Sequence, residues 1–304
     1  MSSKPDVLMQ HNAEQVWQSY QDLLQQHPHL HSPQAAKLLG VSEAALFIAM
    51  HQRDSENCLA LKPDILTLLQ PVHDWRRLFA IQRNDLGVLI HLMHANVRFT
   101  DDTVQLYDAQ QAVYYPRQAS HYVFCLREQG HRGHSVSLNF FDQQGHVLAK
   151  LFLRSKRGQA IAWPFWMRHQ VVLPANALQA LPTYSPYQRS GSSLNAVQRA
   201  FLIGIRELSL LSESRVSLTG RSGHSQFQGL IQNSKADHAW AHISEPEFRA
   251  HFDAQNVSKL ELIEGAQAEL RAFDQAGGAL RIQAQGAAAR QWLLHMQEVL
   301  NETV

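Results

Sequence analysis

Histidine is the residue type in this sequence with the widest range of possible chemistry. The chain of 304 residues contains 18 histidines, beside 27 Lys and Arg, 26 Asp and Glu and two cysteines. Imidazole is a common metal ligand and an axial ligand of haem iron, so this enrichment is compatible with metal or haem handling. Many of the histidines lie among Gln and Asn, where a solvated imidazole needs no special role.

Two histidine pairs have spacings that could bind a divalent metal. His238 and His242 are four residues apart, which on a helix would place both on one face, and His131 and His134 lie in a loop beside a predicted hairpin. No carboxylate at a matching spacing completes either pair, and Trp240 favours packing around the first. The sequence has no P-loop, no Rossmann glycine pattern and no nucleophile elbow.

The composition narrows the class of protein. A formal net charge of +1 gives no overall attraction to nucleic acid or to an anionic membrane. The first residues lack the features of a signal peptide, and no stretch approaches the roughly 20 apolar residues that span a bilayer. Cys58 and Cys125 have no CxxC spacing, which argues against a disulfide framework or a thiolate zinc site. We therefore expect a cytoplasmic protein without membrane insertion, with reduced thiols.

The N-terminal region has the periodicity of short helices. The pattern predicts helices over residues 13–26 and 32–39, with Gly40 as the stop of the second, and a third helix that Ser42 caps and that runs through Met50. The string AAKLLGVSEAAL, residues 35–46, is typical of a helix-turn-helix, so a DNA-binding regulator is one alternative function. Its second helix, EAALFIAM, has no Arg, Lys, Asn or Gln to contact bases or phosphates, which favours helical packing instead.

From Trp75 the pattern changes to strands, and the strands occur in two groups. Segments rich in branched and aromatic residues predict an antiparallel sheet that the apolar segment 163–173 closes by packing. The predicted strands lie within residues 76–84, 87–99, 118–128, 135–142 and 146–154. After a Pro-, Ser- and Gly-rich linker, a helix over 196–209, further strands and a final helix over about 288–300 follow. The predicted fold is α+β, with two tandem similar units that contain large antiparallel β-sheets and with a helical N-terminal segment. The predicted boundaries are 1–173 for the helical segment plus the first sheet repeat, 174–195 for the linker and 196–304 for the second, shorter repeat.

An internal repeat supports this duplication. Residues 137–151, SLNFFDQQGHVLAKL, align with residues 269–283, ELRAFDQAGGALRIQ, and share the sequence Phe-Asp-Gln and the following glycine. The glycine stands where a short hairpin loop needs a positive φ. A self-match of this kind, present in two copies, indicates two stacked units rather than a solenoid.

Three phrases of the sequence, in this order, resemble the haemin-degrading HemS/ChuS group and its single-unit relative ChuX. They are AAKLLGVSEAAL at 35–46, AIQRN at 80–84 and SVSLNFFDQQGHVLAKLFL at 135–153. The resemblance extends over nearly the whole chain and is best over residues 13–157. It implies a pair of similar α+β units and intracellular handling of haem taken up by a Gram-negative bacterium.

The resemblance also implies where haem would bind. Members of the family oppose a histidine from the helical start of the second half to an arginine on a sheet strand of the first half. By alignment through Pro116-Arg117 that arginine falls at Tyr122, beside His121, and phenolate and imidazole are both axial haem ligands. A further family histidine falls near Leu89, close to His91 and His94. Arginines that could pair with the haem propionates are Arg83, Arg117 and Arg127.

The sequence therefore predicts a haem-binding protein for intracellular trafficking or degradation of haem and for iron acquisition, and leaves haem oxygenase-like activity open. The expected partners are haem itself and a haem transporter or a haem oxygenase, and a homodimer is a further expectation. The main alternative is a non-enzymatic interaction or scaffold protein that kept the fold and lost the ligand. Residues 174–209, which stand in place of the family's ligand-bearing helices, contain no histidine.

Overall fold

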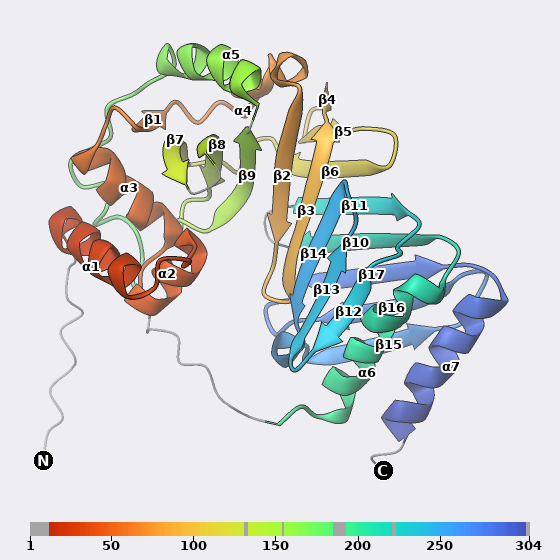
Figure 1. The fold of residues 1–304 in the computed structure, drawn as a ribbon. Helices are drawn as coiled ribbons and strands as arrows, with labels where there is room; N and C mark the ends of the chain where they lie inside the picture. Colours follow the sequence, from red (N-terminus) through yellow and green to blue (C-terminus); the bar gives the residue numbers. More distant parts are fainter. Residues whose placement is uncertain (1–11, 131–132, 154, 185–192, 221–222, 302–304) are drawn as a thin grey trace, which may run out of the picture.

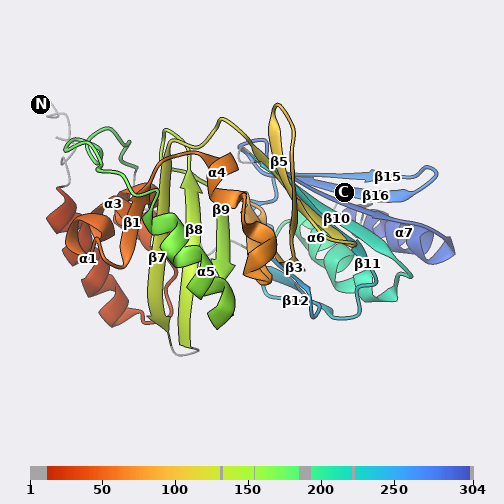
Figure 2. The ribbon, with the colours of Figure 1, turned by 90° about the horizontal axis from the view of Figure 1, so that it is seen from above.

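The computed structural model describes residues 12–130, 133–153, 155–184, 193–220 and 223–301. Two large antiparallel sheets meet at the centre of an elongated molecule, with α1–α3 at one end and α6 and α7 at the other (Figures 1 and 2). Among the described residues no helix is long and apolar enough to cross a membrane. The helices are α1 (Ala13–Gln26), α2 (Ser32–Leu39), α3 (Glu43–Arg53), α4 (Ile65–Leu69), α5 (Lys156–Met167), α6 (Ala196–Arg206) and α7 (Ala287–Asn301), with short 3-10 turns at Val72–Trp75, Glu207–Leu210 and Ala254–Asn256.

The predicted N-terminal helices are confirmed, and their ends have clear chemical causes. Asn12 caps α1 through a hydrogen bond from the Gln15 amide, and Ser42 caps α3 through the Ala45 amide. Gly40 ends α2 in the left-handed conformation, with φ 67°. Every residue of α3 from Glu43 to Met50 is buried. This helix cannot enter a DNA groove without unpacking, so the structure argues against the DNA-binding alternative based on residues 35–46.

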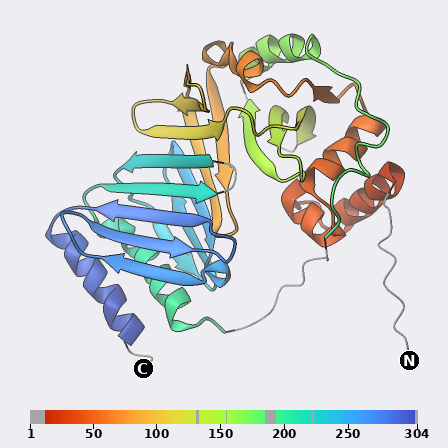
Figure 3. The same ribbon diagram turned by 180° about the vertical axis from the view of Figure 1, so that it is seen from behind.

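The first sheet has nine strands in the order β1-β7-β8-β9-β2-β3-β14-β13-β12. The second has eight, in the order β15-β16-β17-β10-β11-β6-β5-β4, and its stacked strands are seen from behind in Figure 3. The strands of the first half of the chain are β1 (Cys58–Leu61), β2 (Arg77–Arg83), β3 (Gly87–His94), β4 (Asn96–Phe99), β5 (Thr103–Tyr107), β6 (Gln111–Pro116), β7 (Tyr122–Gly130), β8 (Gly133–Phe141) and β9 (Val147–Leu153). Those of the second half are β10 (Ser214–Gly220), β11 (Gly223–Gly229), β12 (Ser234–Asp237), β13 (Trp240–Ser244), β14 (Phe248–Asp253), β15 (Lys259–Ile263), β16 (Ala268–Phe273) and β17 (Ala279–Ala284).

Each sheet contains strands from both halves of the chain. Because β3 pairs with β14 and β11 pairs with β6, the strands β12–β14 extend the first sheet and β4–β6 extend the second. Apart from β1, the order of the first sheet corresponds strand for strand to that of the second. The predicted α+β fold with a tandem duplication is therefore present, but the two halves exchange three strands and neither has a sheet of its own. The boundaries at 173 and 196 stay a prediction.

The duplicated hairpin is formed by β8–β9 in the first half and by β16–β17 in the second. Gly145 and Gly277 have φ of 78° and 85°, as the predicted turns require. In the first turn the Asp142 side chain accepts a hydrogen bond from the His146 backbone N–H. In the second turn the Asp274 side chain accepts one from the Gly278 backbone N–H. The sequence repeat is thus a structural repeat with the same turn chemistry.

Alternation along the strands gives the first sheet two different faces. One face packs on α4, α5 and the second sheet, and here Trp75 and Trp166 meet edge to face with ring centroids 5.0 Å apart. The other face turns toward α1–α3 (Figure 1). On this face Phe47 lies against Phe124 and Phe141. The buried Lys150 Nζ bonds Glu43 and, at 3.0 Å, Ser32 Oγ, which fixes α2 and α3 to this face.

Candidate functional site

The seven residues predicted to hold haem do not form one cluster. One of them, Arg117, donates a hydrogen bond to the Thr100 carbonyl at 3.4 Å. Tyr122 is buried beneath α1–α3, and its ring lies edge to face on the exposed His121, with centroids 4.7 Å apart. The two side chains are in contact because His121 lies just before strand β7 begins. Burial raises the pKa of the Tyr122 phenol, so the phenolate form that would bind ferric iron is disfavoured.

His91 lies on the opposite face of the sheet, in the core between the two sheets. It is fully buried, its Nδ1 is 3.1 Å from Gln111 Oε1, and its ring packs on Phe248. Burial lowers its pKa to about 4. His94 is exposed at the end of the same strand, and Arg127 places its guanidinium 3.9 Å over the Trp163 ring on α5. These three residues therefore lie in three separate environments.

Arg83 is the predicted residue that faces a group of other cations. Burial is the largest influence on the pKa of His31 and of Lys150, which it lowers, and the charge of Arg83 lowers both further. Burial raises the pKa of Glu43, but the charges of Lys150 and Arg83 hold it below its usual value. Arg83 makes no hydrogen bond or salt bridge with the residues that the structure describes, and its Nε is buried without a partner. Its guanidinium is therefore available to a carboxylate ligand.

Beside Arg83 the sheet presents a half-buried apolar surface. We call it the open face and define it by residues on β2, β3, β14 and β13 that share one side of the sheet: Ile81, Arg83, Val88, Ile90, Arg249, His251 and His242. The residues between them on these strands, such as Leu89 and Ala250, are buried on the other side. Arg83, Val88, His251 and His242 stand in register on four neighbouring strands.

Two histidines of the open face form a hydrogen-bonded pair. His242 Nδ1 and His251 Nδ1 are 2.7 Å apart, and their rings meet edge to face. Burial is the main influence that lowers the pKa of each. The charges of His242 and Arg249 lower the pKa of His251 further, and the charge of Lys235 lowers the pKa of His242 further. Both imidazoles are therefore neutral near pH 7, and the ring that donates its Nδ1–H keeps the Nε2 lone pair for a metal.

The helical interpretation of His238 and His242 is wrong. His238 lies in the turn between β12 and β13 with φ 50°, and its side chain is 92% exposed, whereas His242 lies on β13. The partner of His242 is His251, which sequence reasoning missed. The two are equidistant from the centre of the turn, which lies between Pro246 and Glu247, so hairpin pairing across that turn could have found them. Of the other pair, His134 is exposed on β8, and His131 lies outside the described residues.

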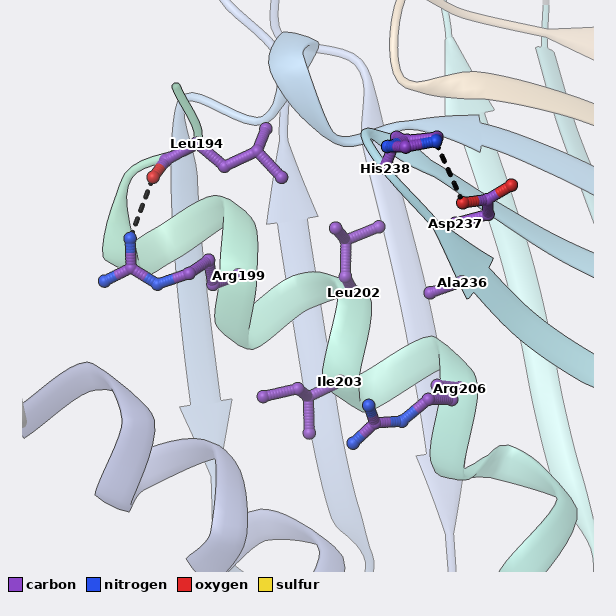
Figure 4. A pocket seen from close by; sticks show the side chains of 8 residues that line it. All are labelled: Leu194, Arg199, Leu202, Ile203, Arg206, Ala236, Asp237 and His238. Atoms are coloured by element: carbon purple, nitrogen blue, oxygen red, sulfur yellow. Dashed lines mark hydrogen bonds and ion pairs between the residues drawn. The ribbon is translucent and has the colours of Figure 1, made fainter.

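A separate, open pocket of about 320 Å³ lies between α6 and the β12–β13 turn. Figure 4 shows Leu202 and Ile203 on its helical side, with His238 beside Asp237 across from them. Arg199 is bound to the Leu194 carbonyl at 2.8 Å, and Arg206 to Glu207 at 3.3 Å. Because both arginines already have partners, this pocket offers less to an anion than the open face does.

Comparison with known proteins explains the architecture. Residues 40–168 match the family model described as the haemin-degrading HemS.ChuX domain. This segment is therefore similar to a HemS/ChuX domain. The hemin transport protein HmuS of Yersinia pestis is 28% identical over 181 residues, which are 56% of this chain and 49% of that protein. The alignment thus spans about half the length of this curated relative.

The fold extends the likeness beyond the HemS/ChuX domain. The structure of holo-PhuS, a heme-binding protein from Pseudomonas aeruginosa, has a TM-score of 0.73 at 18% identity and covers 93% of this chain and 98% of its own. The heme degrading enzyme ChuS of Escherichia coli O157:H7 has a TM-score of 0.75 at 16% identity, with coverage of 93% and 99%. At these identities the likeness shows the shared two-sheet fold of both halves.

Proposed function

We propose that this protein binds haem on the open face and serves as a haem carrier. The observation that carries the proposal is the hydrogen-bonded pair His242–His251, set in register with Val88 and Arg83 on a half-buried part of the sheet. The HemS/ChuX domain and the haem named for HmuS, PhuS and ChuS support haem as the ligand.

The residues of the open face match the chemical requirements of haem. A neutral imidazole with an oriented Nδ1–H is a good axial ligand of iron, and either His251 or His242 can supply it. The side chains of Val88, Ile90 and Ile81 offer apolar contact to a porphyrin, and burying that surface favours binding. Arg83 stands two strands from His251, about 10 Å away, a separation suited to a ligand that carries carboxylates at its periphery. Bound haem supplies an iron centre at which oxygen can be activated.

The predicted ligation by Tyr122 or His121 remains a competing proposal for the same function. The raised pKa of the Tyr122 phenol favours the imidazole pair. A haem transporter and a haem oxygenase remain the proposed donor and acceptor of the haem, in the cytoplasm as predicted from the sequence.

Hemin titration of the purified protein, followed at the Soret band, tests the proposal. We expect one saturable site in the wild type, and affinity about tenfold to a hundredfold weaker in His251→Ala with His242→Ala, because the ligand and its orienting partner are both lost. Arg83→Gln should weaken binding without moving the Soret maximum, because it contacts the propionates and not the iron. His94→Ala, on the same sheet but exposed at the far end of β3, is the matched control.

The other outcomes are equally definite. If Tyr122→Phe or His121→Ala abolishes the Soret shift while the double variant retains it, the ligand lies beneath the N-terminal helices and the open-face assignment is wrong. If the wild type binds hemin no more tightly than an unrelated protein, the interaction role replaces the haem role. Adding a reductant to the loaded protein and following loss of the Soret band separates a carrier from a degrading enzyme, and sedimentation of the same samples tests the predicted homodimer.

A further inference from the structure

A second chemically competent cluster lies at the β8–β9 turn, away from the open face. The Tyr184 hydroxyl is 3.0 Å from His146 Nε2, and His146 Nδ1 is 3.4 Å from Asp142 Oδ2. The phenol is thus hydrogen-bonded to the imidazole, and the imidazole is in ion-pair contact with the carboxylate. Tyr184 is 40% exposed and the His146 side chain 41%, so a solute can reach both.

The surrounding backbone holds this cluster in place. Asp142 also accepts the His146 N–H at 2.8 Å, which fixes the turn that carries both side chains. Gly145 lies against Ser42 at the start of α3, where its carbonyl accepts the Ala44 N–H. From the other side the Tyr184 N–H donates to the Gly40 carbonyl at 2.7 Å. These contacts therefore fix the Tyr184 hydroxyl and the His146 imidazole in position before anything binds to them.

The second copy of the hairpin shows that the turn itself does not need the histidine. There Asp274 stands at the position of Asp142 and makes the same backbone hydrogen bonds, but Gly278 stands at the position of His146. The aspartate is explained by the turn, whereas the imidazole and its tyrosine partner are additions of the first copy. The turn itself does not require these additions.

The geometry matches that of a metal-binding pair. When two atoms each bind a metal ion at about 2.1 Å and the angle between the two bonds is about 90°, the atoms are about 3.0 Å apart. This is the distance between Tyr184 Oη and His146 Nε2. A histidine that binds a metal commonly donates its other N–H to a carboxylate, which is the relation of His146 to Asp142. A phenolate is a hard anionic ligand and suits a hard cation such as ferric iron.

We propose that Tyr184 Oη and His146 Nε2 bind a ferric ion, with Asp142 as the positioning residue of the imidazole. The phenol proton is released to solvent when the ion binds, and water or a small chelator completes the coordination. The site needs no porphyrin and does not rest on the proposed haem function. It gives this protein a place to hold iron itself, separate from haem.

Titration of the haem-free protein with ferric nitrilotriacetate tests the site. Phenolate coordination produces a charge-transfer band in the visible region, and we expect a saturable band in the wild type that is absent in Tyr184→Phe. His146→Ala and Asp142→Asn should weaken binding, the latter about tenfold to a hundredfold, as expected for a lost orienting carboxylate. Because Asp142 also serves the turn, thermal unfolding of each variant accompanies the titration.

Tyr114 is a matched control. Its ring lies 5.7 Å from that of His224, the same centroid distance as between Tyr184 and His146, but the Tyr114 hydroxyl bonds Gln105 and the His224 Nδ1 bonds Thr219. Tyr114→Phe should therefore leave the band unchanged. No saturable band in the wild type, or a band that survives in Tyr184→Phe, would overturn the proposal. Hemin binding measured in the same Tyr184→Phe protein keeps this outcome separate from that of the haem function.

Discussion

Mild acid should destabilise the protein through His91. This residue is fully buried between the two sheets, and burial lowers its pKa to about 4, with the nearby His224 adding to the effect and the Gln111 hydrogen bond opposing it. The unfolded chain protonates the same imidazole near its ordinary value of about 6.5. Between these two values the unfolded state binds more protons, so stability is lost as the pH falls through this window and is unaffected above it.

The magnitude follows from the two pKa values. Going from about pH 7 to about pH 5 should cost about 2 kcal/mol from His91 alone, and the full shift corresponds to about 3 kcal/mol. The assay is urea unfolding at both pH values for the wild type and for His91→Gln. Glutamine can donate to Gln111 Oε1 as the imidazole does, but it does not titrate.

The difference between the two proteins isolates His91, because the four other histidines whose pKa values are lowered titrate in both: His31, His224, His242 and His251. His94→Gln, at an exposed histidine of the same strand, should show the wild-type pH dependence. If the wild type and His91→Gln lost equal stability on acidification, the reasoning about this buried imidazole would be refuted.

Two further predictions concern stability. Lys150→Met should cost about 3–5 kcal/mol, because it leaves the buried Glu43 without its partner, and adding Glu43→Leu should recover much of the loss in the same urea assay. Gly277→Ala should cost only about 1–2 kcal/mol, since the left-handed φ is its one obstacle and nothing lies within 4 Å of the new Cβ. Gly145→Ala should cost about 1–3 kcal/mol more, because its Cβ would collide with Ser42. Equal losses for the two glycine variants would contradict the packing argument.

The local elements were predictable because their causes are local. Capping by Ser42, the stop at Gly40 and the positive φ of Gly145 and Gly277 depend on residues within one turn, and each was found from the sequence. Strand alternation also identified β2, β3 and β7–β9. The same alternation would have placed His242 opposite His251, had the segment around Pro246 been recognised as a hairpin.

The sequence by itself determined the helices, many of the strands, the duplicated hairpin and the resemblance to haem-handling proteins, because periodicity, capping and turn chemistry act over a few residues. Only the tertiary structure decided that β12–β14 join the first sheet and β4–β6 the second, because a strand edge can pair with any complementary edge. It also decided that His91 is buried while Arg83 faces the open surface, and that Tyr184 meets His146. Those contacts depend on which faces pack together, a choice made by the burial of the whole core and not by any single segment.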